Sequence, residues 1–149
     1  MQSADIIELN QLAYRYAAAI DGCDGAALAA LFAPNGRLRA YHPGQEAPFA
    51  DLTGPEQLPA IANAMRGAYR HTMHMMTNHL VDIAGDSASG TVLCTARHLD
   101  PDGASALNVQ IRYEDRYIRL AGVWKITDRR IRFLWSERHD AVDSGFGHG

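Results

Sequence analysis

The chain has 149 residues, of which 47% are hydrophobic and 21% charged, and its formal net charge is -3 at pH 7. This length and composition fit one domain with a substantial core. The negative charge and the lack of a Lys/Arg run argue against nucleic-acid binding. Because no apolar segment approaches the roughly 20 residues that span a bilayer, no membrane association is expected either.

The chain ends and the cysteines indicate the cellular compartment of the protein. The N-terminus lacks the basic start and apolar core of a signal peptide, so we expect a cytoplasmic location. Cys23 and Cys94 show no metal or redox spacing and are expected to be free thiols. We expect one domain over residues 1–142 and a flexible glycine-rich tail over residues 143–149.

Three helices are predicted in the first half of the chain. Residues 4–20 form an amphipathic pattern, with apolar side chains at Ile6, Leu9, Ala13, Tyr16 and Ile20. Asp24 is placed to cap a short second helix, which ends before Pro34-Asn35-Gly36. Thr53-Gly54-Pro55-Glu56 has the pattern of a capping box and opens a third helix, with an apolar stripe at Leu58, Ile61, Ala62, Met65 and Tyr69.

A strand and a loop are predicted between the second and third helices. Residues 37–41 alternate like a short strand. Residues 42–53 contain two prolines and a glycine, so they are expected to form a loop. A loop of this length in a compact domain is often a functional lid.

The second half is predicted to consist almost entirely of strands. They cover residues 71–84, 88–99, 106–120 and 123–137, and the last is interrupted at Thr127-Asp128. Helices followed by a run of strands indicate an α+β domain, in which helices cover one face of a curved, mostly antiparallel sheet. A pocket is expected between that sheet and the helices.

Strand alternation brings several polar side chains to the predicted inner face. Thr72, His74, Met76, Asn78 and Leu80 would share one face, and Met73, Met75, Thr77, His79, Val81 and Ile83 the other. Val92, Cys94, Ala96 and His98 would share a face of the next strand. His74 and His98 would then meet at one apolar cavity, like an active site. The alternative is that both are hydrogen-bonded histidines of an ordinary sheet.

Three segments resemble a known superfamily. They are Tyr16-Ala17-Ala18-Ala19-Ile20-Asp21 with Asp24 and Leu31-Phe32-Ala33-Pro34, the Thr53-Gly54-Pro55-Glu56 helix start, and Gly122-Val123-Trp124-Lys125-Ile126 after Tyr113-Glu114-Asp115-Arg116-Tyr117. Together they resemble the SnoaL-like branch of the nuclear transport factor 2-like superfamily over essentially the whole chain. The resemblance implies a cone-shaped α+β fold with three N-terminal helices on the sheet. Because the superfamily includes several enzyme classes and non-catalytic ligand carriers, the fold does not fix the reaction.

Within that superfamily the catalytic pattern is most similar to scytalone dehydratase. That family uses an Asp after the first helix, a Tyr on the first strand and two His on successive strands, which the resemblance places at Asp21, Tyr41, His74 and His98. Two departures argue against the same substrate. The family's Tyr before the Asp is Ile20 here, and its polar pair on the fourth strand corresponds to Ile111 and Tyr113.

Two other branches match less well. Tyr16 matches the oxyanion-hole Tyr of ketosteroid isomerase, and residues 106–109 resemble the segment that carries its second donor. However, the carboxylate base expected near residues 40 and 41 is missing. The Asp-Arg-Asp arrangement of limonene epoxide hydrolase is also missing, because Arg97-His98-Leu99-Asp100 lacks the spacing.

These residue types suit proton transfer beside a carbonyl, which needs a base and donors that hold the enolate oxygen. We expect His74 and His98 to be the acid–base pair, Asp21 to orient His98, and Tyr41 to donate to the carbonyl. The alternatives are that Asp21 only caps the second helix or closes the turn, and that Tyr41 lies at the surface rather than in the pocket. Candidate substrate-binding side chains are Tyr16, Met76, Asn78, Cys94, Ile111 and Tyr113. No metal or cofactor is expected, since the histidines have no compact ligand spacing.

Two functions follow as alternatives. The first is a cofactor-free lyase or isomerase for a hydrophobic substrate, with aromatic and polyketide-like compounds as candidates. The second is a non-catalytic ligand-binding or accessory subunit, similar to the small subunit of ring-hydroxylating dioxygenases. We interpret the alternating charges of the last strands as a solvated or dimer-facing sheet surface, formed by Arg112, Glu114, Asp115, Arg116, Asp128, Arg129, Arg130 and Arg132. The resemblance implies a homodimer or higher homo-oligomer through that face.

Overall fold

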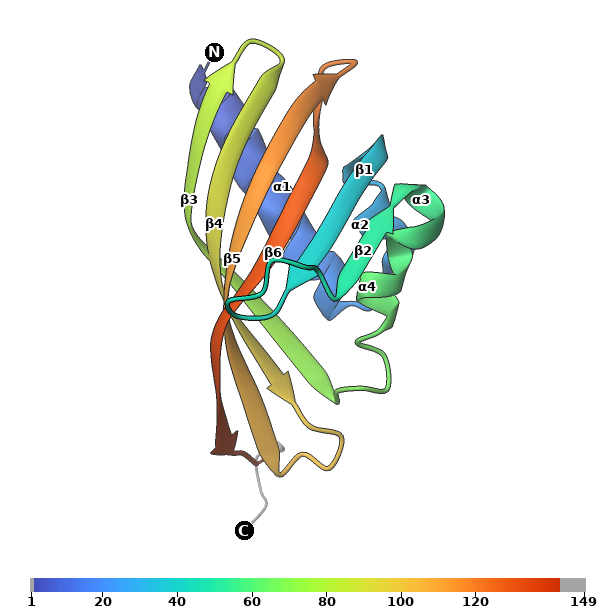
Figure 1. The fold of residues 1–149 in the computed structure, drawn as a ribbon, viewed down its shortest axis with the longest axis vertical. Coiled ribbons are helices and arrows are strands. Elements are labelled where there is room, and N and C mark those ends of the chain that lie inside the picture. Colours follow the sequence, from blue (N-terminus) through green and yellow to red (C-terminus); the bar gives the residue numbers. More distant parts are fainter. Residues whose placement is uncertain (1, 143–149) are drawn as a thin grey trace.

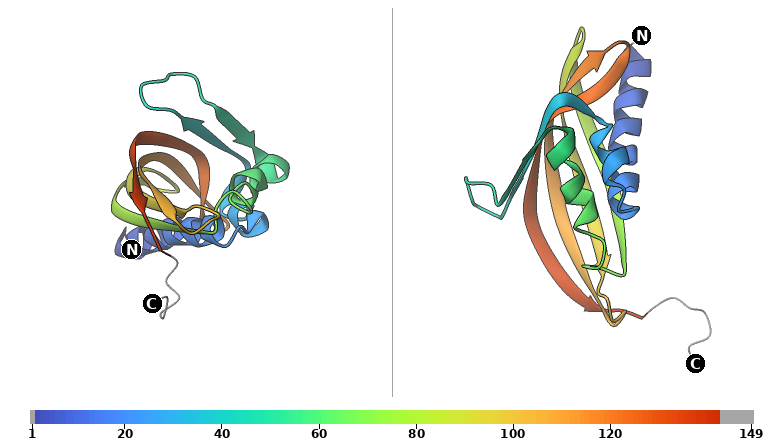
Figure 2. Two further views of the ribbon diagram at one scale, coloured as in Figure 1. Left: turned by 90° about the horizontal axis from the view of Figure 1, so that it is seen from below. Right: turned by 90° about the vertical axis from the view of Figure 1, so that its right-hand side faces the viewer.

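The computed structural model describes residues 2–142 as one strongly curved sheet with helices packed against one side (Figures 1 and 2). The elements are α1 (Gln2–Asp21), α2 (Gly25–Ala29), β1 (Phe32–Tyr41), β2 (Ala50–Thr53), α3 (Gly54–Gln57), α4 (Pro59–Asn63), β3 (His71–Ala84), β4 (Ser87–Leu99), β5 (Ser105–Leu120) and β6 (Val123–Asp140). The predicted α+β class and curved sheet are confirmed. The tail predicted at 143–149 lies outside the described residues. Across the part of the chain described, no helix is both long and apolar enough to cross a membrane.

The six strands form a single sheet in the order β2-β1-β6-β5-β4-β3. Neighbours are antiparallel except β1 and β6, which run parallel. The hydrophobic core lies between the sheet and the helices, and side chains from α1 contribute to it at Leu9, Tyr16 and Ile20, all at most 3% exposed. The helical spacing of these residues therefore buries one stripe of α1, as the sequence predicts.

The segment between β1 and β3 differs from the prediction in two ways. Residues 50–53, predicted as part of a loop, form β2 and pair with β1. The predicted third helix is divided into α3 and α4 at Pro59, because proline lacks the N–H and the room that an interior helical position requires. The side chain of Thr53 makes no cap hydrogen bond; instead its backbone N–H donates to Gln57 Oε1 at 2.9 Å.

A bulge in β3 changes which of its side chains face the core. The register with β4 shifts between Thr77 and Leu80, and Asn78 between them has a positive φ of 50°. Alternation reverses beyond such an extra residue. The predicted faces therefore hold up to Met76 and are wrong after it: Leu80 is 72% exposed, and the inner side is taken by His79, Val81 and Ile83.

A second bulge lies in β6 at Thr127, the position predicted to interrupt the strand. The strand continues through it, and the reversal of alternation places Arg129 on the inner side, where it is 0% exposed. Arg129 meets Asp115, which is 4% exposed. The prediction that Arg129 and Asp115 belong to a solvated charged surface is therefore wrong.

Candidate functional site

Two adjoining cavities lie between the sheet and the helices. The inner cavity has a volume of about 70 Å³ and is lined by Tyr16, Ile20, Ile61, Met65, His74, His98, Ile111, Tyr113, Ile131 and Phe133. The outer cavity, the mouth, has about 400 Å³ and is lined by His42, Pro43, Phe49, Met65, Tyr69, His98, Leu107, Val109, Phe133, Trp135 and Ser136. Both histidines predicted from the sequence thus reach the inner cavity, one from β3 and one from β4.

Asp21, the last residue of α1, accepts three hydrogen bonds from β3. His74 Nδ1 lies 2.7 Å from Asp21 Oδ1, the His74 backbone N–H donates to Oδ2 at 3.0 Å, and the Thr72 hydroxyl donates to Oδ1 at 2.8 Å. Burial would raise the pKa of Asp21, but these hydrogen bonds outweigh it and hold the pKa below its ordinary value. Asp21 is therefore ionised at neutral pH.

The prediction that Asp21 orients His98 is wrong in its partner, because the carboxylate binds His74. Asp21 does not cap α2 either: Asp24 does so, accepting a hydrogen bond from the Ala27 N–H at 3.0 Å. The error has a geometric cause. Asp21 lies at the end of a helix that packs on β3, the edge strand of the sheet, whereas His98 is one strand further in.

His98 is held by a different acceptor. Its Nδ1 lies 3.2 Å from the Leu107 carbonyl oxygen, and its ring contacts those of Tyr69 and His74 at centroid distances of 4.6 and 5.6 Å. Burial, together with the neighbouring charge of His74, lowers the pKa of His98. His98 is therefore neutral at pH 7.

The two acceptors fix the tautomers of both rings. A carboxylate and a carbonyl oxygen can only accept, so Nδ1 carries the proton in His74 and in His98. In the neutral form of either ring, Nε2 is the basic nitrogen. The inner cavity thus has two imidazoles with a free basic nitrogen, one of them backed by a carboxylate.

The floor of the inner cavity is formed by two buried tyrosines. Burial raises the pKa of Tyr16 to about 12, with a smaller opposing effect from Arg129, and raises the pKa of Tyr113 well above its ordinary value. Both hydroxyl groups are therefore neutral donors. The Arg129 guanidinium packs on both rings, 4.2 Å from the Tyr16 centroid and 4.4 Å from that of Tyr113.

A buried polar chain supports this floor. Arg129 binds Asp115 through two hydrogen bonds of 2.8 and 2.7 Å, and both side chains are 0% exposed. The Tyr117 hydroxyl donates to Asp115 at 2.6 Å and lies 3.1 Å from His79 Nε2. No functional role was predicted for these four side chains. The interruption predicted at Thr127-Asp128 marks the β6 bulge, but it does not indicate that the alternation reverses there and brings Arg129 to the inner side.

Four predicted site residues do not line the inner cavity. Tyr41 packs under Arg132, which pairs with it on β6 and lies 4.5 Å from its ring; one residue earlier, Ala40 faces the core. Asn78 is exposed in the β3 bulge. Met76 lines a separate hollow of about 90 Å³ beside α1, and Cys94 is buried in the core. Tyr16, Ile111 and Tyr113, in contrast, line the inner cavity as predicted.

The mouth includes residues that were not predicted to belong to the site. Phe49 and Phe133 stack at a centroid distance of 5.7 Å, and His42 stacks on Phe49 at 4.1 Å. The loop of residues 42–49 thus forms one wall of the mouth and projects from the sheet in Figure 2. Phe133 and Trp135 of β6 also line the mouth.

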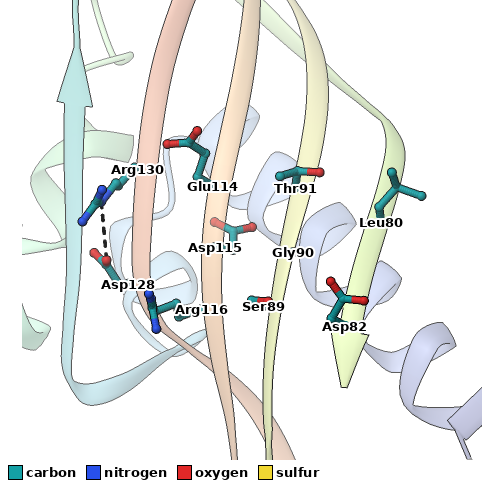
Figure 3. A pocket seen from close by; sticks show the side chains of 10 residues that line it. All are labelled: Leu80, Asp82, Ser89, Gly90, Thr91, Glu114, Asp115, Arg116, Asp128 and Arg130. Carbon is teal, nitrogen blue, oxygen red and sulfur yellow. Dashed lines mark ion pairs between the residues drawn. The ribbon is translucent and has the colours of Figure 1, made fainter. Parts of the chain in front are cut away.

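A larger depression, of about 540 Å³, lies on the sheet face away from the helices (Figure 3). Most of its lining side chains are polar, and several of its charged groups lie in ion pairs: Asp128 with Arg39 and Arg130, and Glu114 with Arg112 and Arg132. Leu80 is the one large apolar side chain among its described lining residues, and none of these residues is a histidine. The cavities between sheet and helices are therefore the better candidate site. Among residues 2–142, no group of His, Cys, Asp and Glu has a metal-binding arrangement.

Comparison with known proteins finds one matching family model and several solved structures of similar fold. A model of the SnoaL-like domain matches residues 1–130. Among solved structures, hexachlorocyclohexane dehydrochlorinase (LinA) Type2 has a TM-score of 0.83 and 18% identity, and covers 98% of this chain and 97% of its own. A provisionally named scytalone dehydratase from Novosphingobium aromaticivorans has a TM-score of 0.81 and 19% identity, with 99% and 97% covered. A single-residue variant of Rv3472 from Mycobacterium tuberculosis, whose function is unknown, has a TM-score of 0.77 and 25% identity, with 89% and 73% covered. No curated protein matches.

Proposed function

The chain belongs to the SnoaL-like domain family, and we propose that it is a lyase or isomerase in which Asp21 and His74 remove a proton beside a substrate carbonyl. The observation that carries the proposal is the 2.7 Å contact between Asp21 and His74, a residue that lines the inner cavity. Two structural neighbours are named for eliminations, a dehydration and a dehydrochlorination, which supports this reaction class.

The Asp21 carboxylate gives His74 the properties of a general base. Because Asp21 accepts the Nδ1 proton, Nε2 is free to take a proton from the substrate carbon. The imidazolium that forms lies against a carboxylate, which stabilises it in a site with little water. In a dehydration the same proton then passes to the departing hydroxyl group, so that water leaves and no other proton carrier is needed.

Tyr16 is proposed as the donor to the carbonyl oxygen as negative charge develops there. Tyr16 lines the inner cavity, its hydroxyl is neutral, and the Arg129 guanidinium packs against its ring face. Preorganised donors of this kind contribute strongly to stabilising an enolate. The neutral Nε2 of His98 is proposed to accept a hydrogen bond from a substrate hydroxyl and so to orient the leaving group.

A direct test uses 4-hydroxy-4-phenylbutan-2-one, a small β-hydroxyketone with an apolar tail. Its dehydration breaks one C–H and one C–O bond, forms a conjugated enone and releases water, so it can be followed by ultraviolet absorbance. The proposal is supported if the wild type turns over this compound and His74→Gln does not. The control is His71→Gln, which changes an exposed histidine of β3 and should retain the activity. Equal rates for wild type and His74→Gln would refute it.

The rival function is ligand binding without catalysis, and the mouth supports it as a second candidate. Stacked aromatic side chains around a cavity of about 400 Å³ are typical of a carrier for hydrophobic molecules. Binding of the β-hydroxyketone with no dehydration above the buffer rate would favour this function. The Asp21–His74 contact makes catalysis the first choice, because a carrier has no need of a carboxylate-backed base.

We also propose that the outer sheet face joins a second copy of the chain. This face carries exposed Met73, Leu80 and Leu93 beside arginine and carboxylate side chains of both signs. A surface with both charges can complement itself across a two-fold axis. Sedimentation equilibrium of the wild type and of Leu93→Glu tests this: a dimer that becomes a monomer supports it, and a monomeric wild type refutes it.

A further inference from the structure

The two cavities of the site meet at a narrow neck. Met65, His98 and Phe133 are the residues that line both the inner cavity and the mouth. A substrate that enters from the mouth therefore has to pass between these three side chains to reach His74. Their packing decides which part of the substrate arrives.

The volumes on the two sides of the neck differ several-fold. The inner cavity measures about 70 Å³ and the mouth about 400 Å³. An apolar cavity of roughly 150 Å³ holds a benzene molecule. The inner cavity is therefore too small for a six-membered ring and takes only a short group, such as an acetyl group, beside His74.

The mouth suits the bulk of an uncharged molecule. None of its lining side chains is a lysine, an arginine, an aspartate or a glutamate. One wall is the aromatic series His42, Phe49 and Phe133, and Trp135, which is 55% exposed, lies on another side. An apolar body in the mouth would bury this exposed aromatic surface.

Of the three neck residues, Met65 is the one that the fold leaves adjustable. His98 is fixed by the Leu107 carbonyl and by Tyr69, and Phe133 is stacked on Phe49. Met65 follows α4 and is half-buried, and its unbranched thioether side chain has three rotatable bonds. A change at Met65 therefore alters the width of the neck without removing a hydrogen bond that holds the site.

We propose that Met65 determines specificity by admitting only a small acyclic end of the substrate to His74, while the apolar body of the substrate stays in the mouth. This proposal rests on the proposed function for the chemistry at His74. It assigns the substrate class as a molecule whose reacting carbon lies on a short chain attached to a bulky uncharged group.

The test compares two ketones by NMR and fluorescence. The ring carbon signals of His74 and His98 report on the inner cavity and the neck, and fluorescence of Trp135 reports on the mouth. For the wild type we expect acetone to shift the His74 signal, whereas the bicyclic 2-tetralone quenches Trp135 and shifts His98 but leaves His74 unchanged. In Met65→Ala, 2-tetralone should shift His74 as much as it shifts His98. Met65→Val is the second variant should Met65→Ala not fold, and Met75→Ala, on the outer face and 38% exposed, is the matched control.

Three outcomes would overturn the proposal: a His74 shift with 2-tetralone in the wild type, no His74 shift in either Met65 variant despite Trp135 quenching, or no quenching in any protein. The controls separate this result from the proposed function. Asp21→Asn should lose turnover of the β-hydroxyketone yet keep the same Met65-dependent response to 2-tetralone. If the wild type does not turn over the β-hydroxyketone, but the Met65 variants respond to 2-tetralone as expected, only the catalytic proposal is refuted.

Discussion

Replacing Asp21 with asparagine is the perturbation that the site geometry describes most completely. The carboxylate accepts the His74 ring N–H and the Thr72 hydroxyl at Oδ1, and the His74 backbone N–H at Oδ2. An asparagine has only one acceptor oxygen. If its NH₂ group takes the Oδ2 position, it faces the His74 backbone N–H, a second donor. If it takes the Oδ1 position, His74 Nδ1 has to become an acceptor, and Nε2 then carries the proton and is no longer a base.

The expected loss of activity follows from these two orientations. A hydrogen bond to a charged group contributes about 1.5–3 kcal/mol, and about 1.4 kcal/mol corresponds to a tenfold change in rate. Loss of charge at Asp21 alone should therefore slow turnover about 10- to 100-fold. The tautomer change adds to this, so we expect a total reduction of roughly 10²–10⁴-fold, the range for losing a general base.

The assay is kcat/KM for dehydration of 4-hydroxy-4-phenylbutan-2-one, measured for wild type, Asp21→Asn and Asp24→Asn. Asp24 caps α2 through its side chain, and asparagine caps equally well, so this variant keeps both fold and activity. Full activity of a folded Asp21→Asn protein would refute the reasoning. A drop that is equal in both variants would mean that the effect is structural.

Three further results are expected from the same structure. Asp115→Ala leaves the fully buried Arg129 charge without its partner and should cost about 3–5 kcal/mol in urea unfolding; a protein as stable as the wild type would show that the pair is not buried. Gly90→Ala would place a Cβ 2.7 Å from the Leu80 carbonyl oxygen and should lower the free energy of unfolding by about 1–3 kcal/mol. The control Gly85→Ala lies at a turn with open space and strains only its own backbone, which has a positive φ. Equal losses of stability in the two variants would argue against crowding at Gly90. Burial lowers the pKa of His98 and of His79, so the unfolded chain binds more protons than the folded chain. The contribution of these histidines to stability should be full above about pH 6.5 and should be lost as the pH falls through their pKa values in the folded protein. A melting temperature that rises on acidification from about pH 7 to about pH 5 would contradict this.

The sequence predicts the strands and helices well because most of them carry a regular apolar period. The inner face of β4, at Val92, Cys94, Ala96 and His98, is buried as predicted. The amphipathic stripe of α1 is confirmed at Leu9, Ala13, Tyr16 and Ile20, whereas Ile6 is 40% exposed. The cap at Asp24 is confirmed. These features depend on local spacing, which a single sequence displays.

The features that were missed depend on irregularities in the strands. Bulges in β3 and β6 reverse the alternation, which moves His79 and Arg129 to the inner side. An extra residue reverses the alternation of every residue beyond it. The β3 bulge was not predicted, and the interruption predicted at Thr127-Asp128 was not interpreted as such a reversal. The buried Asp115–Arg129 pair therefore looked like part of a solvated surface.

The candidate site was predicted in its residue types more accurately than in its contacts. His74 and His98 reach one cavity as expected, but Asp21 pairs with His74, and Tyr41 lies on the other face of β1. Which of two histidines a helix end meets depends on how the helix crosses the sheet, and the sequence does not encode this locally. A shift of one residue along β1 likewise separates Tyr41 from the core-facing Ala40.

The measurement that tests the central claim most directly is the protonation state of the His74 ring, read from ¹⁵N NMR of the wild type and Asp21→Asn. With Asp21 as the acceptor, we predict that Nδ1 of His74 carries a proton that is shifted downfield and protected from exchange, and that this signal is lost in Asp21→Asn. A ring protonated at Nε2, or one whose spectrum is the same in both proteins, would contradict the assignment of Asp21 and His74 as the pair that removes the substrate proton.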